Sequence, residues 1–151
     1  MKYLLTVVLL LVSFVAGENQ QEFSYWSAQV LANYGERLTP KMDADKRAVQ
    51  ELASFGSHSV LMVYRESSAA PAVHDGTDFY VVQGGKASLV LGGELIDPHP
   101  KGPTEVWGTS IKGGKNIDIQ TGDVINIPPR VPHQIILKPG DSISYLVVKI
   151  H

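Results

Sequence analysis

Short apolar runs alternate with clusters of Gly, Pro, Asp and Asn along the second part of the chain, from residue 57 onward. The runs are rich in Val, Ile, Leu and Tyr, which favour strands, whereas the clusters favour turns. We predict Gly84-Gly85 to be a hairpin turn and the Pro-rich stretch 97–103 to be an exposed loop. Many short strands separated by turns are typical of a sandwich or barrel. The predicted strands are 59–64, 78–83, 86–91, 94–96, 105–111, 116–119, 124–127, 134–137 and 142–150.

The segment before residue 57 has a different pattern, with apolar residues spaced as on helices. A first helix is predicted from a Ser24 cap to Thr39-Pro40, because its apolar residues recur every four positions. A second helix is predicted from an Asp43 cap to Gly56. We therefore expect residues 18–56 to form an N-terminal helical arm packed on a β-barrel of residues 57–151. The apolar faces of the two helices are Trp26, Val30, Tyr34 and Leu38, and Ala48, Val49, Leu52 and Phe55.

The first 17 residues have the pattern of a secretory signal peptide. Lys2 precedes an apolar run over 4–12, and small residues follow up to Gly17. The run is shorter than the roughly 20 residues needed to span a bilayer. We expect cleavage near Gly17 and a secreted or periplasmic protein with no stable membrane association afterwards. An uncleaved N-terminal anchor is the alternative.

Length, charge and composition limit the remaining possibilities. The chain has 151 residues, which suits one domain, and a formal net charge of −2, which gives no basic surface for nucleic acid. It has no Cys, so disulfides, thiolate metal sites and a thiol nucleophile are excluded. Any metal site must therefore use His and carboxylate ligands.

Two parts of the predicted barrel supply such ligands. His74 and Asp78 are four residues apart, so on one extended strand they would share a face with Tyr80. His133 follows a stiff Pro-rich corner over 128–132 that fixes its position. If the three converge, two imidazoles and a carboxylate form the facial ligand set of open-sided metal sites.

These residues resemble the two sequence motifs of the cupins, which are small jelly-roll β-barrels. The second cupin motif, G-x5-P-x-G-x2-H, is matched by Gly122, Pro128 and His133, with Arg130 where the motif has Gly. The first motif, G-x5-H-x-H-x3-4-E-x6-G, is matched more loosely. His74 then takes its second His position, Asp78 its Glu position and Gly85 its last Gly, while Ala72 replaces the first His and Glu66 the leading Gly.

The resemblance, which is to small exported bacterial single-domain cupins of uncharacterised function, implies a single jelly-roll barrel. It also implies one divalent ion, Fe, Mn, Zn or Ni, held by His74, Asp78 and His133. Ala72 leaves an open position for water or substrate, or else marks a barrel that has lost its metal.

Other residues are candidates for a substrate site. Glu105 and Trp107 share parity, so at the barrel mouth Glu105 would act as acid–base and Trp107 as a stacking wall. Tyr80 and Gln134 are expected to line the same cavity, and Arg130 to meet an anionic substrate. We expect Arg65 and Glu66 to form a surface ion pair, and His58, His99 and His151 to lie outside the site.

Two functions remain open. One is a metal-dependent enzyme of isomerase, lyase or dioxygenase type acting on a small polar metabolite in the barrel. The other is a non-catalytic barrel that binds a small molecule or sugar without metal. We expect a small-molecule ligand as partner, no nucleic acid, and a homodimer formed through sheet edges, as is usual for barrels of this kind.

Overall fold

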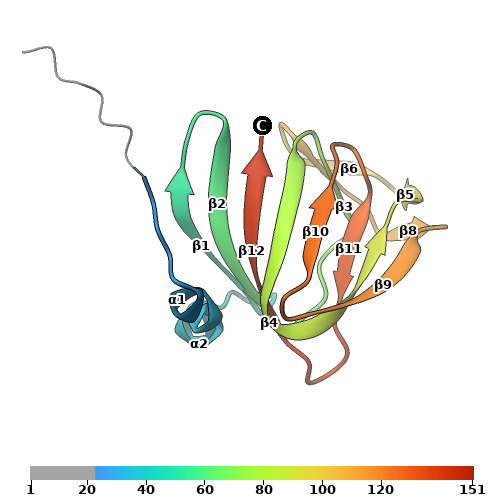
Figure 1. The fold of residues 1–151 in the computed structure, drawn as a ribbon. Helices are drawn as coiled ribbons and strands as arrows, with labels where there is room; N and C mark the ends of the chain where they lie inside the picture. Colours follow the sequence, from blue (N-terminus) through green and yellow to red (C-terminus); the bar gives the residue numbers. More distant parts are fainter. Residues whose placement is uncertain (1–22) are drawn as a thin grey trace, which may run out of the picture.

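A computed structural model describes residues 23–151, which form a curled antiparallel sheet with two short helices at one end (Figure 1). The predicted signal peptide, residues 1–17, lies outside the described residues. The helices are α1 (Ala28–Ala32) and α2 (Tyr34–Leu38), followed by the 3-10 turn η1 (Thr39–Lys41). The strands are β1 (Arg47–Ser54), β2 (His58–Arg65), β3 (Ala72–His74), β4 (Thr77–Leu91), β5 (Glu94–Ile96), β6 (His99–Gly102), β7 (Glu105–Trp107), β8 (Ser110–Lys112), β9 (Lys115–Gln120), β10 (Val124–Ile127), β11 (His133–Ile136) and β12 (Ile143–Ile150).

Ten of these strands form one sheet, ordered β1-β2-β12-β4-β11-β3-β7-β6, with β9 and β10 also paired to β4. All pairs are antiparallel, and β5 and β8 pair separately. The sheet curls so that β3 and β11 face β1, β2 and β12 across the interior, while β10 lies beside the first half of β4 in the same half of the roll as β12 (Figure 1). The predicted mainly β, jelly-roll-type fold is confirmed.

β4 is one continuous strand, so the predicted hairpin at Gly84-Gly85 is wrong. Its first half, up to Gly85, pairs with β12, and its second half, from Lys86, pairs with β9. The strand changes direction at Gly85, where φ is +80° and a Cβ atom would lie 2.0 Å from the Ser142 carbonyl oxygen. Only glycine fits this bend. β4 therefore belongs to both halves of the roll.

The predicted second helix, from Asp43 to Gly56, is also wrong, because Arg47–Ser54 is strand β1 and pairs with β2. Asp43 does cap a turn, since its Oδ1 accepts the backbone N–H groups of Asp45 and Arg47, both at 3.0 Å. Ala48 and Leu52 lie four residues apart on one face, a spacing that suits a strand as well as a helix. Pairing with β2 decides between the two.

The helical arm is shorter than predicted. The expected helix from Ser24 is broken at Asn33, and Ser27 rather than Ser24 caps α1 by accepting the Val30 N–H. Leu38 of α2 is 1% exposed and packs against Ala48 of β1 and Met62 of β2. The two helices thus cover one end of the sheet.

The inner face of the roll holds the main hydrophobic core. Along each strand, residues of this core alternate with residues that point outward. The stretch 97–103, predicted as a loop, contains the short strand β6, although all four of its residues are exposed. No helix within residues 23–151 is long and apolar enough to cross a membrane. The core residues include Val63, Tyr80, Val82, Leu89, Ile127, Ile135, Ile143, Tyr145 and Val147.

Candidate functional site

Three predicted ligands meet inside the roll. One donor atom from each of His74, Asp78 and His133 lies within 4.8 Å of the others. His74 Nδ1 is 3.4 Å and His133 Nε2 is 3.8 Å from Asp78 Oδ2. The predicted convergence of these side chains is therefore present, whereas their service as metal ligands stays a prediction.

The local backbone explains this convergence, although not by the route predicted. His74 ends β3 and Asp78 lies in β4, so the two are not on one strand but flank a tight turn. At Gly76 in this turn, a Cβ atom would lie 2.3 Å from the Ile150 carbonyl oxygen. The Pro-rich corner is tied to the same turn, because the Arg130 N–H donates to the His74 carbonyl at 2.8 Å.

Arg130 adopts a φ of +62°, the left-handed conformation that suits the Gly of the cupin motif. The corner thus keeps the motif's backbone shape with a different residue.

Hydrogen bonds fix which nitrogen each imidazole presents. His133 Nδ1 lies 3.0 Å from the Val131 carbonyl, which only accepts, so Nδ1 carries the proton and Nε2 presents its lone pair toward Asp78. His74 Nδ1 lies 2.7 Å from the Lys149 ammonium, so it is the acceptor and Nε2 carries the proton. Both lone pairs are therefore directed to the region around Asp78.

Burial keeps both imidazoles neutral. It lowers the pKa of His74, and Lys149 and His133 lower it further against the opposing effect of Asp78. Burial likewise lowers the pKa of His133, against the Val131 carbonyl and Asp78, which raise it. Neutral imidazole is the form that binds a metal ion.

Lys149 is a member of the site that the sequence analysis missed. Its ammonium lies 3.0 Å from Asp78 Oδ1 and 3.3 Å from Oδ2, and it is the closest cation to a carboxylate that is only 3% exposed. The available signal was strand alternation, since Tyr145 and Val147 of β12 are buried and Lys149 has the same parity. Lys149 thus supplies the positive charge that a buried Asp78 requires.

Glu105 and Trp107 on β7 complete one wall of the site. Glu105 Oε1 accepts the Trp107 indole N–H at 2.6 Å and lies 3.5 Å from His74 Nε2. The ammonium of Lys101 lies 4.3 Å from the centre of the Trp107 ring. The two residues face inward as predicted, and Glu105 is held beside His74.

A cavity of about 330 Å³ opens over these side chains. Ala72, Tyr80 and Gln134 line it as expected, and the Tyr80 hydroxyl donates to Asp78 Oδ2 at 3.3 Å. Arg65 also lines it, so the predicted surface ion pair between Arg65 and Glu66 is wrong. Glu66 instead accepts the Tyr64 hydroxyl at 2.9 Å.

Several candidates lie elsewhere. Arg130, expected to meet a substrate, is 81% exposed, pairs with Asp75 at 3.7 Å and does not line the cavity. His58 stacks on Phe55 with ring centres 4.8 Å apart, and His99 and His151 are exposed. The predicted exclusion agrees with the structure for His58 and His99, whereas His151 lines a small hollow of about 190 Å³ together with His74, Asp78 and Lys149.

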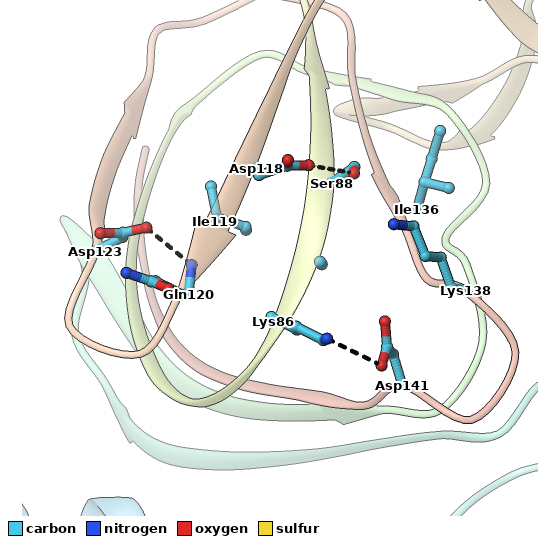
Figure 2. Close-up of a pocket in the computed structure, with 10 residues that line it drawn as sticks. Lys86, Ser88, Asp118, Ile119, Gln120, Asp123, Ile136, Lys138 and Asp141 are labelled. Carbon is cyan, nitrogen blue, oxygen red and sulfur yellow. Dashed lines mark hydrogen bonds and ion pairs between the residues drawn. The ribbon is translucent and has the colours of Figure 1, made fainter.

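A larger hollow of about 510 Å³, between β4, β9 and the segment after β11, contains three aspartates but no histidine (Figure 2). Each carboxylate already has a partner within the protein. Asp118 accepts the Ser88 hydroxyl at 2.7 Å, Asp123 accepts the Gln120 N–H at 2.8 Å, and Asp141 pairs with Lys86 at 3.8 Å (Figure 2). Within residues 23–151, the group of side chains that could hold a metal ion is therefore the one around Asp78 and not this hollow.

No family model matches the chain, and no curated protein matches it. Solved structures do. An uncharacterised double-stranded β-helix protein from Klebsiella pneumoniae matches with TM-score 0.57 and 14% identity over 85% of this chain and 90% of its own. A cupin 2 conserved barrel protein from Rhodopseudomonas palustris matches with TM-score 0.51 and 17% identity over 69% and 60%. The polyketide cyclase RemF from Streptomyces resistomycificus matches with TM-score 0.52 and 19% identity over 72% and 68%.

The chain therefore has the cupin fold, as the motifs predicted, while the resemblance to exported cupins in particular stays a prediction. The matched structures also include DMSP lyases and a protein assigned as a mannose-6-phosphate isomerase. At these identities the likeness shows the fold alone. The chain also spans only 60% of the Rhodopseudomonas protein.

Proposed function

We propose that this protein is an exported metalloenzyme that uses one divalent ion to transform a small polar metabolite inside the barrel. The observation that carries the proposal is the group His74, Asp78 and His133, whose donor atoms lie within 4.8 Å of one another in a cavity. Isomerase and lyase chemistry agree with the enzymes that share the fold. Dioxygenase chemistry is compatible with the same ligand set.

The chemistry of the donor set fits such an ion. Both histidines are neutral and present a lone pair toward Asp78, and the buried carboxylate requires a cation. Lys149 now fulfils that requirement, so its ammonium has to leave before an ion is held. Its side chain is 32% exposed, so the ammonium can move into solvent when an ion binds. The identity of the ion is open among Fe, Mn, Zn and Ni.

A bound divalent ion would supply a Lewis acid that polarises an oxygen atom of the substrate. The protein supplies the proton transfer. Glu105 lines the cavity beside His74 and is fixed by the Trp107 indole, so its carboxylate is placed to accept or return a proton. The face of Trp107 forms a wall on which the substrate packs.

Metal analysis of protein purified without an affinity tag tests the proposal. We expect one ion per chain in the wild type, or uptake of one ion on reconstitution. Asp78→Asn and His133→Asn should lose it, whereas the exposed control His99→Asn should keep it. Absence of a stoichiometric ion after reconstitution, or its retention by Asp78→Asn, refutes the metal site.

A non-catalytic barrel is the second candidate, and the Lys149 ammonium favours it because it satisfies Asp78 without metal. Such a protein should gain thermal stability from its ligand in the presence of a chelator, since ligand binding stabilises by mass action. If chelation abolishes every ligand response, this alternative fails.

The proposal of export rests on the apolar pattern of residues 1–17. Mass spectrometry of the protein from the periplasmic or extracellular fraction should find a new N-terminus near Glu18. An intact Met1 in that fraction favours the uncleaved anchor instead.

A further inference from the structure

The cavity has a second charged region, formed by two arginines from the first two strands. Arg47 and Arg65 are directly opposite each other in the pairing of β1 with β2. Arg65 has the parity of Val63, which is buried in the barrel core, so both arginines extend from the inner face of the sheet. Both line the same cavity as His74 and Asp78.

Among the residues that the structure describes, these two guanidinium groups lack a protein counter-ion. Within residues 23–151, no carboxylate forms an ion pair with either of them, although Asp45 lines the same cavity. The Nε atom of Arg47 is buried and has no hydrogen-bond partner. Two like charges placed opposite each other on a sheet repel, and an unsatisfied buried donor costs free energy. An anion would correct both defects.

The side-chain hydrogen bond that Arg65 makes goes to a neutral group. Arg65 Nε donates to the Tyr145 hydroxyl at 3.3 Å. Burial raises the pKa of Tyr145 even though Arg65 and Arg47 lower it, so the phenol keeps its proton. Tyr145 therefore orients Arg65 without neutralising it.

The arginine pair is also reachable from outside. A neighbouring cavity of about 530 Å³ is lined by Arg47, Arg65 and Trp107 as well. The two cavities share these three residues, so the arginine pair lies at the boundary between them; Asp43 and Asp45 also line the neighbouring cavity.

We propose that Arg47 and Arg65 form a subsite for the carboxylate or phosphate group of a small metabolite. Planar guanidinium groups bind both kinds of anion with paired hydrogen bonds. The charged end of the metabolite rests on the arginines while its other end points to Asp78 and Glu105. This last statement rests on the proposed function, whereas anion binding by the arginines does not.

Calorimetric titration of metal-free protein with inorganic phosphate and with malonate tests the subsite. The variants are Arg47→Gln and Arg65→Gln, and the matched control is Arg37→Gln, an exposed arginine of α2 that stacks on Tyr34. We expect wild type and Arg37→Gln to bind at least one of the two anions equally well. Each subsite variant should bind about tenfold to a hundredfold more weakly, because each loses hydrogen bonds to a charged group.

The outcomes separate this inference from the metal proposal. Failure of the wild type to bind either anion overturns it, and so does equal binding by Arg65→Gln. A third refutation is binding that Lys149→Met abolishes while both arginine variants retain it, because the anion would then sit on Lys149. Preference for phosphate or malonate identifies the anion class. Metal analysis of the same samples reports on the metal site separately, since neither arginine contacts Asp78.

A stability measurement supports the same test. Saturating anion should raise the urea concentration at which wild type unfolds, because the anion binds the folded arginine pair. It should raise that of Arg65→Gln much less, and this comparison does not depend on the hydrogen bond to Tyr145 that the variant loses. An equal rise in both proteins would overturn the subsite.

Discussion

Replacing Lys149 by Met tests how the site divides its cavity between an ammonium and a metal ion. Met keeps most of the side-chain length and removes the charge. In the metal-free protein, the ammonium lies 2.7 Å from His74 Nδ1 and 3.0 Å from Asp78 Oδ1. A divalent ion held by the same lone pairs must displace it, so the wild type loses these contacts whenever it binds metal.

The expected magnitude follows from those contacts. A hydrogen bond to a charged group contributes about 1.5–3 kcal/mol. At about 1.4 kcal/mol for each tenfold change, Lys149→Met should bind Zn²⁺ or Mn²⁺ roughly 10- to 150-fold more tightly than wild type. Titration calorimetry after removal of chelator measures this ratio. Lys86→Met, at a residue whose side chain is 71% exposed, is the matched control and should bind like wild type.

The metal-free variant should also be less stable, because Asp78 is left buried without its cation. Removing one partner of a buried pair costs about 3–5 kcal/mol, and the partial exposure of Lys149 favours the lower end. Metal at a hundred times its dissociation constant should restore about 2.7 kcal/mol in urea unfolding. Equal or weaker metal binding by the variant would refute the displacement. Binding by Lys149→Met alone would support displacement but contradict a metal-dependent wild type.

Three further predictions concern pH, the strand bend and assembly. Histidines of the unfolded chain take up protons near pH 6.5, whereas burial lowers the pKa of His74 and His133 in the folded protein. The free energy of unfolding of the metal-free protein should therefore fall as the pH falls below about 6.5. A double His→Gln variant with a pH profile as steep as that of wild type would contradict this. Gly85→Ala should lower the free energy of unfolding in urea by at least about 3 kcal/mol. The control Gly56→Ala should lower it by less than about 0.5 kcal/mol, because a Cβ atom at this position meets nothing within 4 Å. We also expect a homodimer by light scattering, formed at exposed sheet edges such as β1, and a monomer at all concentrations would reject it.

The sequence supports the position of the ligands better than the position of the surrounding charges. His74, Asp78 and His133 are spaced as in a known pair of motifs, and a Pro-rich corner restricts His133. Lys149 belongs to no motif. Its entry into the site depends on β12 lying beside β4, a long-range pairing that local pattern does not specify. The sequence analysis placed Arg65 in a surface ion pair for the same reason, because strand pairing and not local pattern brings this residue to the cavity.

Strand and helix were confused where one spacing suits both. Ala48 and Leu52 could share one face of a strand or one face of a helix. The turn that Asp43 caps could precede either element, so it does not distinguish them. Backbone pairing with β2 makes this segment a strand, and the spacing of apolar residues within 43–56 does not show that pairing. In β4, the pair Gly84-Gly85 is typical of a hairpin turn. In the structure, the positive φ of Gly85 only bends the strand, which continues beyond it. Composition alone therefore indicates that the chain bends here, but not whether it turns back as a hairpin or continues as one strand.

The continuity of β4 couples the site to global unfolding. This strand carries Asp78, pairs with β12 beside Lys149 and pairs with β11 beside His133. A partial opening that frees either half of the roll must break hydrogen bonds along the same strand. Amide exchange at β4, β11 and β12 should therefore report one common opening free energy, close to that of the whole domain. Any small molecule that the cavity binds would then enter by side-chain motion, because separating the strands would break up the group around Asp78.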